Sequence, residues 1–237
     1  MRSLDIQSSR LLLFDYGGTL DVPARHWSNV LWEAYQYVGL KVEYARFRDA
    51  YVYAERRLEA DGLISASDVF RNVLYKKFLL QLDFLHVPQT ELYAGQMADY
   101  CDTLVRRNLT SSRKLLSQLS EAGFELGVVS NFYGNLSVVL EDYDLLSFFR
   151  TVIDSAVVGV RKPSSDIWQK AFDKTGFSES QTIVIGDSFK NDIEPAHFLG
   201  CQTVWLKGEM WNPGEFDETI PDVVTSSLDD LQQILLP

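Results

Sequence analysis

The chain has 237 residues, of which 46% are hydrophobic and 23% charged, a balance that is ordinary for a soluble globular protein with one large domain or a domain with an insertion. The formal net charge of −11, without a basic stripe, argues against a nucleic-acid partner. No apolar run approaches the ~20 residues of a membrane span, and the first residues lack the apolar segment of a signal peptide. Cys101 and Cys201 show neither metal-ligand spacing nor a disulfide framework, so we expect them to be buried and reduced, in the cytoplasm.

The first predicted element is a buried strand at residues 11–14. Its apolar run ends abruptly in acid, glycine and hydroxyl residues, with the sequence Asp15-Tyr16-Gly17-Gly18-Thr19-Leu20-Asp21. In an open parallel sheet, ligands bind outside the carboxyl ends of the strands. We therefore expect Asp15 to lie at a binding site.

Residues 26–108 are predicted to be helical, with no convincing strand. Apolar side chains recur in this region at the i, i+3, i+4 spacing of a helix face. Stripes of this kind begin at Trp27, Phe70 and Met97, and a helix richer in charge is expected over residues 44–60.

From residue 111 onward, strands alternate with helices. This alternation predicts a parallel sheet with right-handed crossovers. The fold class is therefore α/β, with a doubly wound, Rossmann-like core at residues 1–21 and 111–237 and an all-helical insertion at residues 22–110. The expected strands of the core after the first are residues 124–130, 151–154, 182–185, 202–206 and 223–224, and the expected helices are residues 113–121, 136–140, 163–172, 193–199 and a last one from Ser227.

A second apolar run, at residues 182–185, also ends in acid. It continues as Gly186-Asp187-Ser188-Phe189-Lys190-Asn191-Asp192. Carboxylates at the ends of two strands of one sheet can converge on a single cation, and hard divalent cations take oxygen ligands. The pair of runs therefore predicts a metal site at the carboxyl edge of the sheet.

Together with two shorter motifs, these runs resemble the haloacid dehalogenase superfamily, most of whose members are phosphatases. The second motif, a strand that ends in Ser or Thr, resembles Val128-Val129-Ser130-Asn131, and the third, a lysine shortly before a helix, resembles Arg161-Lys162-Pro163. The resemblance covers nearly the whole chain. It implies that residues 22–110 are the helical cap that the family inserts after its first motif. We expect this cap to open and close at hinges near residues 21–25 and 108–112.

The resemblance also implies roles for individual residues. Asp15 would be the nucleophile and form an aspartyl-phosphate, while Lys162 would balance charge on the transferring phosphoryl group. Ser130 and Asn131 would donate hydrogen bonds to that group. Mg²⁺ would be bound by Asp15, the carbonyl of Gly17, Asp187 and Asp192, the last as ligand or as an orienting residue. Taken one at a time, these residues also suit simpler roles, such as a turn for Asp15 and a solvated surface position for Lys162.

One position departs from the family pattern. The phosphatases carry a second Asp two residues after the first, where it acts as general acid and base, and this chain has Gly17 there. General acid–base catalysis is worth roughly a hundred- to ten-thousand-fold in rate. Asp21 and His26 are the nearest replacements, although a turn residue and a helix N-terminus are the favoured interpretations of the two. Dehalogenases have Tyr at this position, but Tyr16 lies one place too early.

Three functions compete on this evidence. The leading one is a Mg²⁺-dependent phosphatase that acts on a small phosphorylated metabolite, with activity that is weak or restricted to good leaving groups. The second is a 2-haloacid dehalogenase-like hydrolase, which would use Asp15 on an acidic substrate without a metal. The third is a catalytically weak protein that binds or senses a phosphoryl ligand. A pure binder needs no nucleophile, so the combination of Asp15, Lys162 and Asp187 favours the enzyme.

Overall fold

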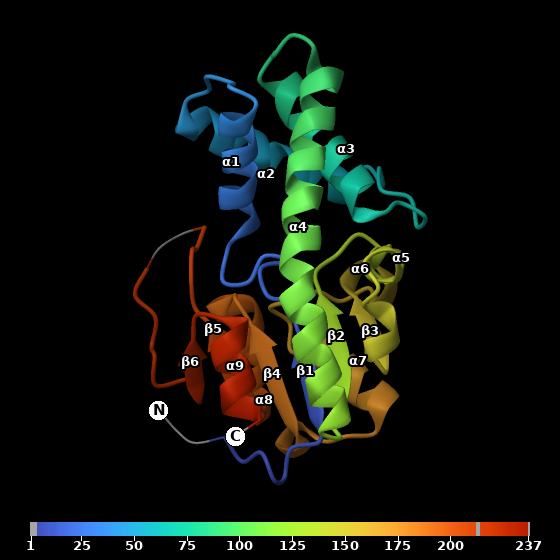
Figure 1. The fold of residues 1–237 in the computed structure, drawn as a ribbon, viewed down its shortest axis with the longest axis vertical. Coiled ribbons are helices and arrows are strands. Elements are labelled where there is room, and N and C mark those ends of the chain that lie inside the picture. Colours follow the sequence, from blue (N-terminus) through green and yellow to red (C-terminus); the bar gives the residue numbers. More distant parts are fainter. Residues whose placement is uncertain (1–3, 212–213, 237) are drawn as a thin grey trace.

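The computed structural model describes residues 4–211 and 214–236 and has an α/β fold with a helical insertion (Figure 1). Its centre is a six-stranded sheet with the order β3-β2-β1-β4-β5-β6, in which every pairing is parallel. The predicted fold class is confirmed. The strands are β1 (Leu11–Phe14), β2 (Glu125–Ser130), β3 (Thr151–Asp154), β4 (Thr182–Gly186), β5 (Gln202–Leu206) and β6 (Val223–Thr225).

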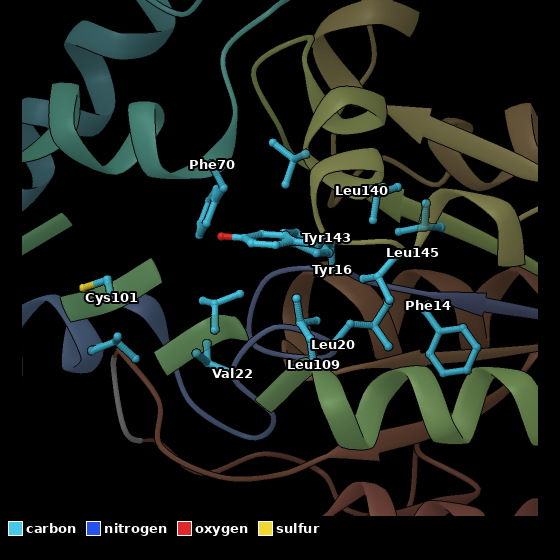
Figure 2. Close-up of a cluster of buried hydrophobic side chains, with 14 of the residues drawn as sticks. Phe14, Tyr16, Leu20, Val22, Phe70, Cys101, Leu109, Leu140, Tyr143 and Leu145 are labelled. Atoms are coloured by element: carbon cyan, nitrogen blue, oxygen red, sulfur yellow. The ribbon is translucent and has the colours of Figure 1, made fainter. Parts of the chain in front are cut away.

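Both faces of the sheet are covered, because alternate side chains of a strand point to opposite faces. Leu12 and Phe14 of β1 belong to the larger core cluster, whereas Leu11 and Leu13 pack in a second cluster with Trp168. Figure 2 shows part of the larger cluster, in which Phe14 lies among side chains of neighbouring helices. The helices of the core are α5 (Leu136–Asp142), α6 (Ser155–Val158), α7 (Asp166–Thr175), α8 (Glu194–Leu199) and α9 (Leu228–Leu235), with a π-helical turn at Phe189–Ile193 before α8.

The insertion between β1 and β2 is helical, as predicted. It stands over one end of the sheet (Figure 1). Its helices are α1 (Trp27–Tyr37), α2 (Tyr44–Ala60), α3 (Phe70–Phe84) and α4 (Thr90–Glu121). Most residues of the predicted stripes, among them Val30, Phe78 and Met97, are buried, and others, such as Trp27, are half-buried. None of the helices in the described ranges is both long enough and apolar enough to cross a membrane.

The helix α4 corrects one sequence-based expectation. Residues 97–105 and 113–121 were predicted as separate helices with a hinge near residues 108–112, but α4 is continuous from Thr90 to Glu121 and runs from the insertion down along the core (Figure 1). Its polar side chains at the expected break bind the loop after β1 instead of interrupting the helix. Asn108 Nδ2 donates to the carbonyl of Asp21 at 3.1 Å, and Ser112 Oγ donates to the carbonyl of Leu20 at 2.6 Å. The division of the chain at residues 21/22 and 110/111 stays a prediction.

The segment after β5 also contacts the start of the insertion. The main chain of Glu209 accepts from His26 N–H and donates to the carbonyl of Ala24, each at 2.9 Å. A Cβ atom at Gly208 would overlap the carbonyl oxygen of Ala24. Glycine at 208 is therefore what allows this close approach. The two cysteines are free and buried, as predicted.

We predict that Gly208→Ala lowers the free energy of unfolding by roughly 1–3 kcal/mol, the usual cost of overpacking. The matched control is Gly95→Ala. Gly95 lies inside α4, and a Cβ there meets nothing within 4 Å, so this variant should gain up to about 1 kcal/mol in helix propensity. Urea unfolding of both variants is the measurement. Equal stabilities of Gly208→Ala and the native protein would contradict the close approach.

Candidate active site

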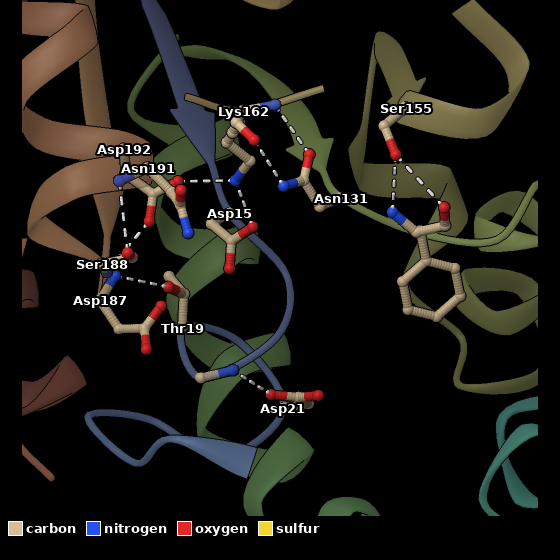
Figure 3. Close-up of polar contacts among 12 residues, drawn as sticks. Asp15, Thr19, Asp21, Asn131, Ser155, Lys162, Asp187, Ser188, Asn191 and Asp192 are labelled. Carbon is tan, nitrogen blue, oxygen red and sulfur yellow. Dashed lines mark hydrogen bonds and ion pairs between the residues drawn. The ribbon is translucent and has the colours of Figure 1, made fainter. Parts of the chain in front are cut away.

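The acidic residues singled out from the sequence meet at the carboxyl edge of the sheet (Figure 3). The central strand β1 lies between β2 and β4, so the chain leaves these neighbours in different directions and a crevice opens above them. Asp15 follows β1 directly, Ser130 ends β2, and Asp187 follows β4. The topology thus brings together groups that are far apart in the sequence.

A buried lysine joins two of the carboxylates. Lys162 Nζ lies 2.5 Å from Asp15 Oδ1 and 2.6 Å from Asp192 Oδ1 (Figure 3). The Lys162 side chain is 2% exposed. Burial by itself lowers the pKa of a lysine, but the charges of Asp15 and Asp192 outweigh burial here and hold the pKa of Lys162 above its usual value. Lys162 is therefore charged at neutral pH. Its burial contradicts the interpretation as a solvated surface residue.

Asp187 is held in place by its main chain. Its N–H donates to Thr19 Oγ1 at 3.1 Å, and its carbonyl accepts from Trp205 Nε1 at 2.9 Å. The carboxylate lies against Gly18, where a Cβ would come within 2.5 Å of Asp187 Oδ2. Gly18 also has a φ of 84°, which disfavours other residues. The glycine of the first motif therefore makes room for the acid of the last one.

The three carboxylates form a site that fits a hard divalent cation. Oxygen atoms of Asp15, Asp187 and Asp192 all lie within 4.8 Å of one another. Burial and the neighbouring carboxylates raise the pKa of Asp187 well above its usual range, and burial raises the pKa of Asp192 to about 6 despite Lys162. One lysine does not compensate three acids, so the group carries a surplus of negative charge. Asp192 Oδ2 also accepts from Ser188 N–H at 3.0 Å, which fixes its orientation.

The loop after β2 supplies Ser130 and Asn131. Ser130 lines the cavity. The Asn131 side chain makes two hydrogen bonds with the main chain of Lys162, of 3.0 Å to its carbonyl and 2.8 Å from its N–H, and so positions the lysine. Asp154, at the end of β3, accepts from the N–H groups of Gly134 and Leu136 and fixes this loop. The sequence analysis did not single out Asp154, although an acid at the end of a predicted strand was a visible signal.

At the position where the family has its second Asp, Gly17 leaves open space. A Cβ at Gly17 would lie 3.5 Å from the Trp27 ring, which is ordinary contact. Asp21 is fully buried, and its carboxylate accepts from the N–H groups of Gly18 (2.7 Å), Val22 (2.6 Å) and the Trp27 indole (2.9 Å). Burial raises the pKa of Asp21 to about 7, against the effect of these hydrogen bonds. Because both oxygens accept, Asp21 is a turn residue that also anchors Trp27.

His26 is the N-cap of α1, as the favoured interpretation had it. Its Nδ1 accepts from Ser28 N–H at 3.1 Å, so the proton of the neutral ring is assigned to Nε2. Burial lowers the pKa of His26 to about 4. At neutral pH, His26 is consequently a hydrogen-bond donor and not a proton reservoir.

The cavity over the carboxylates has a volume of about 260 Å³ and is lined by both the core and the insertion. Lys77 of α3 and Glu55 of α2 form its wall on the side of the insertion, together with Tyr51 and Phe70. Neither Lys77 nor Glu55 was among the residues predicted from the sequence. The signal was the position of Lys77 within the apolar stripe that Val73, Leu74 and Phe78 form, because a charge on such a stripe needs a buried partner.

The chain belongs to the haloacid dehalogenase-like hydrolase family, whose model matches residues 75–206, more than half of the chain. The resemblance seen in the motifs is thus confirmed at the level of the family and of its helical cap, α1–α4. The chain is 34% identical over 118 residues to the phosphoglycolate phosphatase of Escherichia coli, a match that covers 49% of this chain and 46% of that enzyme. The chain therefore spans about half the length of this relative.

Solved structures share the whole fold. The HAD-hydrolase YfnB of Bacillus subtilis, crystallised with magnesium, has a TM-score of 0.58 at 21% identity and covers 97% of this chain and 99% of its own. The L-2-haloacid dehalogenase RSc1362 has a TM-score of 0.63 at 20% identity, with coverages of 97% and 99%. At these identities the likeness shows the fold alone. Phosphatases and dehalogenases are both built on it.

The neutral His26 makes stability depend on pH. The unfolded histidine has a pKa of about 6.5, so it binds a proton below that pH. In the folded protein His26 binds this proton only when the pH falls to about 4. The native protein should therefore lose up to about 3 kcal/mol, relative to His26→Asn, as the pH falls from 7 to 4. Asparagine retains the cap acceptor but does not titrate. Urea unfolding of both proteins across this range is the measurement, and parallel pH profiles would contradict the assignment.

Proposed function

We propose that the protein is a Mg²⁺-dependent phosphohydrolase that acts on small phosphorylated metabolites through an aspartyl-phosphate on Asp15. The observation that carries the proposal is the convergence of Asp15, Asp187 and Asp192 on one point, with the single cation Lys162 between two of them. Such a surplus of negative charge suits a divalent cation.

The proposed ligands of Mg²⁺ are Asp15, Asp187 and the carbonyl of Gly17, with Asp192 as a ligand or as the residue that orients Lys162. Mg²⁺, when bound, would reduce the repulsion between the nucleophile and the phosphoryl group. This cation suits the carboxylate and carbonyl oxygens present here, and glycine keeps the carbonyl although it lacks the family's acidic side chain.

Different residues of the chain would carry out different parts of the reaction. Asp15 Oδ1 is bound to Lys162, which leaves Oδ2 to attack phosphorus. A bond forms from this oxygen to phosphorus while the bond from phosphorus to the leaving oxygen breaks, and water then hydrolyses the aspartyl-phosphate. Ser130, Asn131 and Lys162 would contact the phosphoryl oxygens, and the charge of Lys162 would stabilise the negative charge that they carry.

Gly17 limits this chemistry, because it supplies no proton to the leaving group. Both carboxylate oxygens of Asp21 already accept hydrogen bonds, from three N–H donors in all, and neutral His26 has a pKa of about 4, so neither is a good substitute. The leaving group would depart as an anion. Acyl and aryl phosphates, whose leaving groups are acidic, should therefore react faster than alkyl phosphates.

Dehalogenation through Asp15 is the competing activity on the same fold. It uses no metal, so it offers no reason for three converging carboxylates. The two activities give different products, which the following experiment measures together.

We predict that the protein releases phosphate from an aryl phosphate in the presence of Mg²⁺ and not after chelation. Asp15→Asn and Asp187→Ala should each lose at least roughly a thousandfold in kcat, because one removes the nucleophile and the other a metal ligand. Asp173→Asn, at an exposed position of α7, is the matched control and should retain full activity. Chloride release from a 2-chloro acid without Mg²⁺, in place of phosphate release, would show that the protein is a dehalogenase.

The missing acid can be restored by Gly17→Asp. The space beside Trp27 admits the new side chain, because a Cβ at residue 17 lies at ordinary contact distance. Turnover of alkyl phosphates should rise by roughly a hundred- to ten-thousand-fold, and turnover of aryl phosphates should change far less. The measurement is the dependence of kcat on leaving-group pKa. A flat dependence in the native protein would contradict the proposal, since it would mean that another group already donates the proton.

A further inference from the structure

The cap-side wall of the catalytic cavity carries an ion pair between a buried lysine and a half-buried glutamate, which the proposed chemistry does not use. Lys77 Nζ of α3 lies 2.6 Å from Glu55 Oε1 of α2, and these side chains are 10% and 25% exposed. Tyr133 of the core donates its hydroxyl hydrogen bond to Glu55 Oε2 at 2.7 Å. All three residues line the same cavity as Asp15 and Asp187.

The hydrogen-bonding capacity of this pair is unevenly used. The ammonium group of Lys77 has three N–H donors, and within the described part of the chain Glu55 is its only ion-pair partner. Glu55 Oε2 accepts from Tyr133, whereas Oε1 forms an ion pair with Lys77 but has no hydrogen-bond partner in the described part of the chain. Although burial opposes it, the charge of Glu55 holds the pKa of Lys77 above its usual value, so the lysine stays charged. N–H donors of Lys77 and the acceptor Oε1 of Glu55 therefore remain available for hydrogen bonds at the wall of the cavity.

An ion pair at this position is better explained by ligand binding than by stability. Burying two charges costs more than packing apolar side chains of the same size, so such a pair contributes little to stability. It stands among aromatic side chains, with Lys77 Nζ at 5.6 Å from the centre of the Tyr133 ring. A polar group in an otherwise largely aromatic wall fixes the orientation and the identity of whatever binds there.

We infer that Lys77 and Glu55 form a subsite for a hydroxyl group at the end of the substrate remote from the phosphoryl group. This inference rests on the proposed phosphohydrolase function. A hydroxyl group accepts from Lys77 and can donate to a remaining lone pair of Glu55, so it leaves the pair electrically balanced. A carboxylate would be repelled by Glu55, an ammonium group would be repelled by Lys77, and an apolar end would leave both charges without solvation.

The substrate class that follows is a small phosphorylated compound with a hydroxyl group at the end remote from the phosphoryl group. The cavity, of about 260 Å³, is slightly smaller than usual small-molecule sites, which suits a few carbon atoms beside the phosphoryl group. This class differs from phosphoglycolate, whose remote end is a carboxylate.

The test compares two alkyl phosphates, and because the extra hydroxyl groups make the leaving group of glycerol 3-phosphate more acidic, the readout is how a variant changes the ratio of their kcat/KM values. The native protein should have a kcat/KM for glycerol 3-phosphate that exceeds that for propyl phosphate at least roughly tenfold, the value of one hydrogen bond to a charged group. Lys77→Met should abolish this preference. The matched control, Lys76→Met, should retain it, because Lys76 pairs with Asp68 outside the cavity.

Two further variants sharpen the test. Lys77→Met leaves the half-buried Glu55 without its cation, so Lys77→Met combined with Glu55→Gln is measured beside it and should show the same loss of preference. Glu55→Gln alone removes the repulsion of carboxylates. It should raise the kcat/KM for phosphoglycolate relative to that for glycerol 3-phosphate by at least roughly tenfold.

Equal kcat/KM values of the native protein for glycerol 3-phosphate and propyl phosphate would overturn the subsite while the phosphohydrolase function stands. If the native protein hydrolyses no phosphate ester, the proposed function fails, and binding decides the subsite. Glycerol 3-phosphate should then raise the thermal midpoint of the native protein and of Lys76→Met, but not that of Lys77→Met. An equal rise in all three proteins would overturn the subsite.

Discussion

The buried contact between Lys162 and the carboxylates of Asp15 and Asp192 is the constraint on which the site depends. Three acids converge at the edge of the sheet, and without a cation between them their repulsion would push them apart. Much of the surrounding structure serves to hold this arrangement. Asn131 fixes the main chain of Lys162, and Gly18, which has no Cβ, leaves room for the carboxylate of Asp187. The parallel sheet contributes the convergence itself, because it releases these groups from neighbouring strands.

The core and the cap contribute different groups to the cavity. The core provides the charged groups for the proposed phosphoryl chemistry, and two of them, Asp15 and Asp187, directly follow the paired strands β1 and β4. The cap closes the cavity with aromatic side chains and the pair of Lys77 and Glu55. Tyr133, from the core, reaches Glu55 of the cap at 2.7 Å, so the recognition of the remote end depends on the cap lying on the core. Family members with the same core can therefore differ in substrate through the cap.

Much of this arrangement was predictable from the sequence, and the exceptions have physical reasons. The strands before Asp15 and Asp187 were visible because an apolar run that stops in acid and glycine is a local signal. The continuity of α4 was hidden because Asn108 and Ser112 look like a linker until their side chains find the carbonyls of the loop after β1. The burial of Lys77 was visible in its place on an apolar stripe, but its partner was not. Its partner Glu55 lies on another helix, and no local pattern joins the two.

The most direct test of the account is a search for the phosphoryl group on Asp15. The protein is mixed with an aryl phosphate and Mg²⁺, quenched with acid during turnover, and the peptide that contains Asp15 is analysed by mass spectrometry. Because Gly17 provides no base to activate water, the aspartyl-phosphate should accumulate, and the account predicts a phosphorylated Asp15 peptide that disappears when substrate is exhausted. Continuous phosphate release with Asp15 unmodified at every time point would contradict the account.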